Sequence, residues 1–437
     1  MAKAIIHTTI YDETRLIKDA YVVFDHRIIA TGPMTDFKDQ GYEVIDGSDQ
    51  ILMPSFVCGH AHIYSALSRG MSVPFSPANF QDILDQLWWL LDRNLDLPAI
   101  EDSGIVASVD YLRNGVTTII DHHASGTIKG SLDALKRSVF ERVGLRGAFA
   151  FETSDRFDVE AAIAENTAFY RNNQTKWTRG HFGMHASMSL SEDTLKRIKE
   201  KIGEQPIHIH VAESEMDQED AQKEYDERVI HRLNRHGLLN ENSLIVHGTY
   251  LTDSELDIIK GKGCAIVTNV TSNMNNGVGL PRIKAFLDKG IPVLIGNDGI
   301  SGSMASEYAH VYFAMHHDYG TPNRFGLTDL RRMIDDGYDY VNRLFGIRIG
   351  RIEPGYEADI MLVPYIPPTP IDHENAFAHL FFGLFPSFRP KRVFIAGIER
   401  VKDYEVDHGL TLAYRKARRS AKELWERIDQ EVRARES

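Results

Sequence analysis

His60 and His62 stand two residues apart at the end of an apolar run that begins at Ile51. Alternate residues of a β-strand point to the same side, so two imidazoles at this spacing can reach one ion from one strand end. Neutral imidazole is the commonest protein ligand for metal ions. Two exposed histidines near a turn would give the same pattern, so the pair alone leaves both interpretations open.

Further candidate ligands and acid–base groups follow later apolar runs: His210 with Glu213, then His247, then Asp298. If these runs are strands of one barrel, their carboxyl ends converge on the face where barrel enzymes have their active sites. Several imidazoles and a carboxylate would then meet, a donor set that suits Zn²⁺ or another first-row divalent ion. Chance placement of such groups at four separate strand ends is improbable.

The elements that must position these residues alternate along the middle of the chain. Short apolar runs, which predict strands, are separated by segments with helical spacing, as is typical of a parallel sheet covered by helices. Eight such runs favour a closed (β/α)8 barrel over the alternative, a doubly wound sheet. The runs are Leu52–Gly59, Thr117–Asp121, Arg146–Glu152, His181–Ala186, Ile207–Ala212, Ser243–Gly248, Cys264–Asn269 and Val293–Gly296.

The two ends of the chain differ from this middle, because both are rich in short strands with polar turns. We expect residues 1–53 and 352–410 to form a small β-sandwich domain and residues 54–351 to form the barrel. Residues 411–437 predict a charged C-terminal helix, with a packing or interface face at Ala413, Ala417, Leu424 and Ile428. An α/β architecture of a barrel plus a terminal β domain follows.

Composition limits the function classes. The 437-residue chain has a net charge of −13, which argues against nucleic acid as a partner, because phosphate binding needs a basic surface. No apolar run approaches the ~20 residues of a membrane span, and the N-terminal residues lack a long apolar signal segment. The two cysteines form no CxxC pair, so a reducing cytoplasmic location is expected. Homo-oligomerisation, as a dimer or higher, is expected without a direct sign in the sequence.

The order of these motifs resembles the metal-dependent amidohydrolase superfamily over almost the whole chain. Within it, the chain is similar to the mononuclear aminohydrolases, which include guanine, S-adenosylhomocysteine, cytosine and triazine deaminases or chlorohydrolases, and most of all to the SsnA-type aminohydrolases. The segments that carry the resemblance are Gly59–Ala66, Trp88-Trp89, Asp121–Ser125 and Pro367–Pro370.

The resemblance implies a role for each strand-end group. His60, His62, His210 and Asp298 would be ligands of one divalent ion, with Zn²⁺ favoured and Fe²⁺ or Mn²⁺ as alternatives. Glu213 would be the acid–base catalyst, His247 would lie beside the metal-activated water, and Asp298 would also accept a proton or hydrogen bond. The fourth run has no closing lysine of the kind that binuclear relatives carry, which favours one metal. The chain departs from the family pattern at Val270, where proline is usual, and at Asn297, where threonine is common.

Six further residues are substrate-binding candidates, each with a structural alternative. Trp88 could stack on a flat ring or pack a helix. Glu152 could hold a substrate N–H or pair with Arg146 or Arg156. His185 and His123 close their runs and could contact substrate or serve as supporting hydrogen-bond groups; only one of His122 and His123 can face inward, and His123 is favoured. The last two candidates fall at the strand-seven motif of the family, Asn269 and Asn273.

The sequence therefore predicts a metal-dependent aminohydrolase that deaminates a cyclic amidine or a purine- or pyrimidine-like heterocycle. The alternative keeps the same activated water and changes the bond, as in cyclic amide ring opening or another C–N or C–Cl hydrolysis. A barrel that only binds a partner is disfavoured by the intact ligand set and Glu213. The expected partner is a small heterocyclic molecule.

Overall fold

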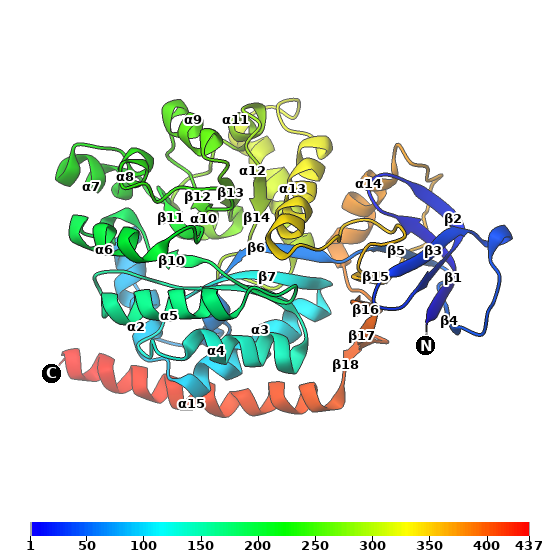
Figure 1. The fold of residues 1–437 in the computed structure, drawn as a ribbon, viewed down its shortest axis with the longest axis horizontal. Helices are drawn as coiled ribbons and strands as arrows, with labels where there is room; N and C mark the ends of the chain where they lie inside the picture. Colours follow the sequence, from blue (N-terminus) through cyan, green and yellow to red (C-terminus); the bar gives the residue numbers. More distant parts are fainter. Residues whose placement is uncertain (1, 437) are drawn as a thin grey trace.

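The two ends of the chain together form one β-sheet domain. The computed structural model describes residues 2–436, and Figure 1 shows this domain beside the helix-rich body. Its nine strands are joined in the order β18-β17-β16-β15-β5-β1-β2-β3, with β4 paired to β1. They are β1 (Lys3–Tyr11), β2 (Leu16–Phe24), β3 (Ile28–Pro33), β4 (Glu43–Asp46), β5 (Gln50–Pro54), β15 (Ile360–Pro364), β16 (Arg392–Ile395), β17 (Ile398–Lys402) and β18 (Glu405–Val406).

This domain differs in one respect from the expected sandwich. Hydrogen bonds connect all its strands into a single sheet, whereas a sandwich has two. The sheet buries its own apolar core, separate from that of the body, with members such as Val22, Phe24, Leu52, Ile360 and Phe394. The N-terminal and C-terminal strands share this core, which explains how segments more than 300 residues apart make one domain.

The body contains the eight predicted strands and one short additional strand, β9. They form two parallel sheets, of order β6-β7-β8-β9 and β10-β11-β12-β13-β14. The strands are β6 (Phe56–Ala61), β7 (Val116–His123), β8 (Arg146–Phe151), β9 (Thr178–Gly180), β10 (Phe182–Met184), β11 (Ile207–Val211), β12 (Leu244–His247), β13 (Ala265–Thr268) and β14 (Val293–Ile295).

The two parallel sheets adjoin at two places, between the ends of β6 and β14 and between the end of β8 and β10. A parallel bridge joins Ala61 to Asp298, and another joins Thr153 to Met184. The first bridge matters most for function, because it brings the residue between His60 and His62 next to Asp298. The first predicted run divides near Pro54: β5 belongs to the terminal sheet and β6 to the body.

Helices cover the outside of the parallel strands, as Figure 1 shows. The C-terminal helix α15 runs along the lower edge of the body in that view, and Ala413, Ala417, Leu424 and Ile428 on it are buried. The helices are α1 (Phe80–Ile83), α2 (Trp89–Arg93), α3 (Leu97–Arg113), α4 (Ser131–Leu135), α5 (Val159–Asn172), α6 (Glu192–Ile202), α7 (Glu215–Tyr225), α8 (Val229–Arg235), α9 (Asp253–Gly261), α10 (Val270–Asn276), α11 (Ile283–Asp288), α12 (Met304–Tyr319), α13 (Leu327–Phe345), α14 (Ala376–His379) and α15 (His408–Glu436).

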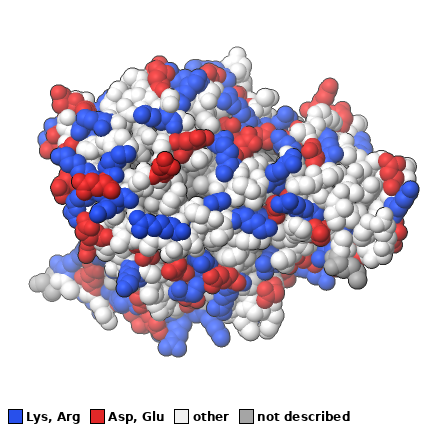
Figure 2. Space-filling model, in the orientation of Figure 1, with Lys and Arg blue, Asp and Glu red and all other residues white. Residues whose placement is uncertain are grey.

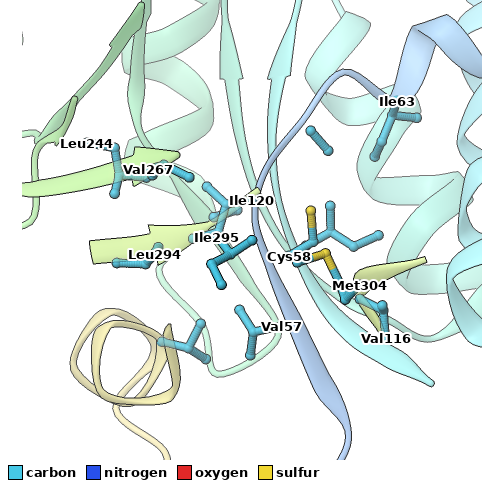
Figure 3. Packing of buried hydrophobic residues seen from close by; sticks show 14 of the residues in the cluster. Val57, Cys58, Ile63, Val116, Ile120, Leu244, Val267, Leu294, Ile295 and Met304 are labelled. Atoms are coloured by element: carbon cyan, nitrogen blue, oxygen red, sulfur yellow. The ribbon is translucent and has the colours of Figure 1, made fainter. Parts of the chain in front are cut away.

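The interior between strands and helices is closely packed with aliphatic side chains. Figure 3 shows Cys58 beside Met304 in this interior. Burial raises the pKa of the Cys58 thiol to about 12, so it packs as a neutral side chain. This packing fixes β6 and with it the histidines at its carboxyl end.

Charged side chains are spread over the surface. Figure 2 shows acidic and basic side chains interspersed over the visible face. Within residues 2–436, every helix is too short or too polar to cross a bilayer.

A buried ion pair connects the body to the terminal sheet domain. Arg146, at the start of β8, is fully buried and donates to Asp359, while Glu357 lies 3.8 Å away from its guanidinium. Asp359 also accepts a hydrogen bond from the Ala396 backbone N–H at 3.0 Å. Arg146, one of the two arginines considered as a partner for Glu152, therefore pairs elsewhere.

Replacing Asp359 with alanine is expected to lower the free energy of unfolding by about 3–5 kcal/mol, because it leaves the Arg146 charge buried beside a single carboxylate. The measurement is the midpoint of denaturant unfolding. Asp429→Ala is the control, since Asp429 pairs with Arg433 on the surface of α15 and its side chain is 58% exposed; a change within about 0.5 kcal/mol is expected there. Equal effects of the two substitutions would contradict a structural role for the buried pair.

Candidate metal centre and active site

Four of the predicted strand-end residues come together at the carboxyl edge of the parallel strands. His60 is the penultimate residue of β6, His62 follows that strand, His210 lies in β11 and Asp298 follows β14. The Oδ1 atom of Asp298 is 3.0 Å from His62 Nε2 and 3.3 Å from His60 Nε2. The Nε2 atoms of His210 and His62 are 3.2 Å apart. One ligand atom from each of the four side chains lies within 4.8 Å of every other, a spacing suited to a single metal ion.

The hydrogen bonds behind this group set the tautomers of two imidazoles. His62 Nδ1 is 2.7 Å from the His122 carbonyl oxygen, and His210 Nδ1 is 3.0 Å from the His185 carbonyl oxygen. A carbonyl only accepts, so both Nδ1 atoms carry hydrogen and both Nε2 atoms of the neutral rings present bare lone pairs. Two lone pairs 3.2 Å apart repel, and a shared cation removes that repulsion. The donor set therefore fits a divalent ion.

The pKa shifts of His60, His62 and Asp298 indicate that this site attracts positive charge. Burial lowers the pKa of His60 to about 4. Burial acts in the same direction on His62, yet the adjacent Asp298 carboxylate raises the pKa of His62 to about 9. Burial raises the pKa of Asp298, but the adjacent His62 and His60 together have the larger, opposite effect. The pKa of Asp298 therefore lies well below its ordinary value. Asp298 is thus an anion that attracts a proton or a metal ion to this place.

Glu213 and His247 lie next to these four residues. The Oε2 atom of Glu213 is 3.4 Å from His247 Nε2, and Glu213, His247 and Asp298 form a second close group. Burial raises the pKa of Glu213 against the opposing effect of His247, a direction that suits a proton-exchanging group. Three non-glycine residues here have left-handed backbones: Ala212 (φ 50°), His247 (φ 68°) and Asp298 (φ 55°). Strain of this kind is concentrated at functional sites.

Helix α10 connects the two carboxylates of the site. Ser272 Oγ donates to Asp298 Oδ2 at 2.5 Å, and Asn276 Nδ2 donates to Glu213 Oε1 at 3.3 Å. Asn276 Nδ2 is also 3.4 Å from Ser272 Oγ. Sequence reasoning assigned no role to Ser272 or Asn276, whose four-residue separation is the available signal, since residues i and i+4 share a helix face.

Asn273 supports His247 from behind the site. Its Nδ2 donates to Thr249 Oγ1 at 2.9 Å and to the Gly279 carbonyl at 3.1 Å, so its Oδ1 accepts from His247 Nδ1 at 2.8 Å. This contact keeps hydrogen on Nδ1 and leaves His247 Nε2, which has no hydrogen-bond partner within residues 2–436, free for a ligand. Asn273 was expected to contact the substrate directly, whereas in the structure it positions the His247 ring.

Asn273→Ala is expected to lower kcat by about 10–100-fold with little change in metal content, because the His247 ring loses the contact that fixes its tautomer. Steady-state kinetics on the best substrate, together with metal analysis, measure this effect. Asn275→Ala is the matched control, since Asn275 is on the same helix and exposed. An unchanged kcat in the Asn273 variant would contradict the positioning role.

A cavity of about 490 Å³ opens beside the four-residue group. Trp88, Glu152 and His185, all predicted substrate contacts, line it together with His62, His210, Glu213 and Asp298. Its remaining lining is Tyr64, Phe80, Leu84, Trp89, Asp92 and Asn276. The aromatic lining with a few polar groups is typical of small-molecule sites.

Two other predicted contacts lie away from this cavity. His123 is buried beside Ser125 and Tyr64, whereas the His122 ring is 4.7 Å from His210 and 5.7 Å from His62, centre to centre. The structure thus gives His122 the place beside the ligand group for which His123 was favoured. Asn269 is buried below the site, where its Oδ1 would lie 2.4 Å from a Cβ at Gly296, so only glycine allows this close approach.

Sequence reasoning also missed an ion-pair cluster that borders the cavity. Arg156 donates to Glu152 at 2.6 Å and to Asp92 at 2.9 Å, and its guanidinium lies 4.4 Å from the centre of the Trp89 ring. A salt bridge from Glu152 to Arg156 was one of the two expected alternatives. Asp92 lies 60 residues earlier in α2, and no local pattern connects it to the other two.

Comparisons with known proteins agree with this geometry. A 5'-deoxyadenosine deaminase of Methanosphaera stadtmanae is 27% identical over 79% of this chain and 81% of its own. A zinc-bound adenosine deaminase of Xanthomonas campestris has a similar fold, with a TM-score of 0.82, 20% identity and coverage of 96% of this chain and 98% of that one. A zinc-bound atrazine chlorohydrolase of Arthrobacter aurescens gives a TM-score of 0.79 at 19% identity, over 97% and 99% of the two chains.

A family model provides the assignment itself. The model described as the amidohydrolase family matches residues 51–399, which include all four residues of the candidate metal group as well as Glu213 and His247. The match covers well over half of the sequence. The chain belongs to the amidohydrolase family.

Proposed function

We propose that this protein is a metal-dependent aminohydrolase that deaminates a purine-like or related cyclic amidine heterocycle. The observation that carries the proposal is the gathering of one ligand atom each from His60, His62, His210 and Asp298 within 4.8 Å of one another, with Glu213 and His247 adjacent. In this proposal His60, His62, His210 and Asp298 hold one ion, for which Zn²⁺ is favoured because zinc is named in two similar structures. The relatives named as deaminases of adenosine derivatives support a purine-like substrate.

The proposed chemistry adds water to the carbon that bears the amino group and releases ammonia. A divalent ion held by the four side chains supplies one function: it lowers the pKa of water to ~7. Glu213 takes a proton from the attacking water and delivers it to the nitrogen of the heterocycle or of the leaving group. The product is the corresponding oxo-heterocycle, so that atoms and charge balance.

His247 and Asp298 complete the proton path. In its neutral form His247 has hydrogen on Nδ1, so Nε2 accepts a hydrogen bond from the water. His247 thereby orients the attacking water. Asp298, through the carboxylate that Ser272 orients, takes the second proton of the water and delivers it to the leaving amino group, which departs as ammonia.

The same proposal extends to the architecture. We infer that the two adjoining parallel sheets act as one closed (β/α)8 barrel, that the terminal sheet domain supports it, and that the protein works as a homo-oligomer. The two bridges between the sheets support closure of the barrel. We also propose that, within the family, this chain is most similar to the SsnA-type aminohydrolases.

The test is ammonia release from a panel of heterocyclic amines by metal-loaded protein, with metal analysis of the same sample. Adenosine, 5'-deoxyadenosine, 5-methylthioadenosine, S-adenosylhomocysteine, guanine and an aminotriazine form the panel. We expect one ammonia per substrate consumed, with about one metal ion per chain. Consumption without ammonia would support the second candidate, hydrolysis of another C–N or C–Cl bond, which the likeness to a chlorohydrolase favours. Binding without consumption would contradict both.

A further inference from the structure

One wall of the cavity presents hydrogen-bond acceptors that the proposed chemistry does not use. We call it the acceptor wall and define it as Asp92, Glu152 and His185. All three side chains line the cavity and are at least 90% buried as residues. Each has a polar atom without a protein partner, as described below, and a ligand that fills the cavity must offer donors to these atoms or leave them unpaired.

Glu152 contributes a carboxylate with one free oxygen. Its Oε1 accepts from Arg156 at 2.6 Å and from Ser154 at 3.4 Å. No hydrogen bond to Oε2 occurs within residues 2–436. The ion pair with Arg156 keeps the carboxylate charged, so Oε2 is a strong acceptor, and hydrogen bonds to charged groups are about twice as strong as neutral ones.

His185 also presents an acceptor. The Ser189 hydroxyl donates to the Ala186 carbonyl at 3.1 Å, so His185 Nδ1 must be the donor in its 2.8 Å contact with Ser189 Oγ. With hydrogen on Nδ1, the Nε2 of the neutral ring is a bare acceptor beside the cavity.

The charge balance of the wall is negative. The carboxylates of Asp92 and Glu152 share one guanidinium, that of Arg156, which both of them bind. Asp92 Oδ1 is buried and has no hydrogen-bond partner within the described residues. Arg156 is engaged by both acids and does not line the cavity, so it is not available to bind an anionic substituent.

Aromatic rings in the cavity add a requirement on the shape of the ligand. Tyr64, Trp88 and Trp89 line the same cavity, and the Trp89 ring lies 6.1 Å from that of His185. Such rings favour flat ligands. A ligand that satisfies the whole wall must be flat, must carry N–H donors and must be neutral or cationic there.

We propose that the substrate is a guanidine-type heterocycle: beyond the amidine that loses ammonia, it carries a second N–H donor edge that binds Glu152 Oε2 and His185 Nε2. This inference rests on the proposed function, since it assumes that the cavity holds the heterocycle. It narrows the substrate class from any cyclic amidine to those with an additional amino or ring N–H donor and without an anionic group on that edge.

Binding tests the inference without requiring turnover. Isothermal titration of metal-loaded protein compares 2-aminobenzimidazole with 2-methylbenzimidazole, which has a substituent of similar size and no added donor. We expect the amino compound to bind about 10–100-fold more tightly. Benzimidazole-5-carboxylate is expected to bind more weakly than benzimidazole. Equal affinities of the amino and methyl compounds, or tighter binding of the carboxylate, would overturn the proposal.

Turnover supplies the second comparison. Adenosine is compared with 2-aminoadenosine and 8-aminoadenosine, because the extra donor can face the wall in only one ring orientation. We expect kcat/KM for one aminated substrate to exceed that for adenosine by at least 10-fold. Glu152→Gln is expected to reduce both this preference and the amino-over-methyl binding preference at least fivefold, since a neutral amide oxygen is the weaker acceptor.

The control variant is Glu160→Gln, because Glu160 is on the surface of α5 with its side chain 61% exposed. Its preferences are expected to match those of the unmodified protein, and metal content and Tm verify that each variant is folded. The two proposals fail separately. A binding preference without turnover of any substrate would remove the aminohydrolase function and keep the acceptor wall. Turnover without a preference for the aminated compounds, and without an effect of Glu152→Gln, would contradict the role of the acceptor wall and leave the aminohydrolase function supported.

Discussion

Glu213→Gln is expected to lower kcat by about 10²–10⁴-fold while the protein keeps its metal ion. Glutamine preserves the size of the side chain but cannot accept a proton from water. Glu213 is not one of the four residues of the candidate metal group, so that group remains intact. Asn276, which donates to Glu213 Oε1, can still bond to the amide oxygen. The loss therefore falls on the proton transfer and leaves the binding site assembled.

Initial rates and metal analysis on the same preparation measure this effect. Glu215→Gln is the matched control, because Glu215 is two residues further along and exposed, and full activity is expected for it. Retained turnover in the Glu213 variant would show that another group accepts the proton, and His247, 3.4 Å away, would be the next candidate. Loss of the metal as well would show that Glu213 supports the ion and would contradict the separate role given to it.

The sequence was informative wherever function depended on strand ends. His60, His210 and Asp298 each follow or end a short apolar run, and parallel strands bring such ends together whatever their separation along the chain. The rule needs only the pattern of apolar runs. Boundaries were less accurate, since the run beginning at Leu52 is shared between β5 and β6, which belong to different domains.

Residues whose position depends on three-dimensional packing were harder to predict. Strand parity allowed only one of His122 and His123 to face inward, and the less favoured His122 ring packs beside His210. Asp92 reaches the cavity from α2, and nothing in the sequence near Glu152 indicates that contact. Likewise, alternating patterns identify strands but not their partners, so the terminal strands were expected as a sandwich and form one hydrogen-bonded sheet.

Removal of the metal is expected to abolish activity, with a loss of about 10³-fold or more, and to lower the Tm. Activation of water by the ion lowers the activation free energy by several kcal/mol, and each 1.36 kcal/mol changes the rate about tenfold. Stability falls because an ion that binds only the folded protein shifts the folding equilibrium towards it. Without the ion, the His62 and His210 lone pairs face each other at 3.2 Å unless a proton joins them.

Treatment with a chelator followed by addition of Zn²⁺, Fe²⁺ or Mn²⁺ measures both effects and compares the three ions. His210→Ala should reproduce the loss without rescue, because one of the four donors is then missing. His317→Ala is the control, since His317 is exposed on α12, remote in sequence from all four donors. If the chelated protein keeps its activity and its Tm, the four side chains do not hold an ion that contributes to catalysis or stability. The close approach of His62, His210 and Asp298 would then have to be explained by a proton on His62, whose raised pKa allows that alternative.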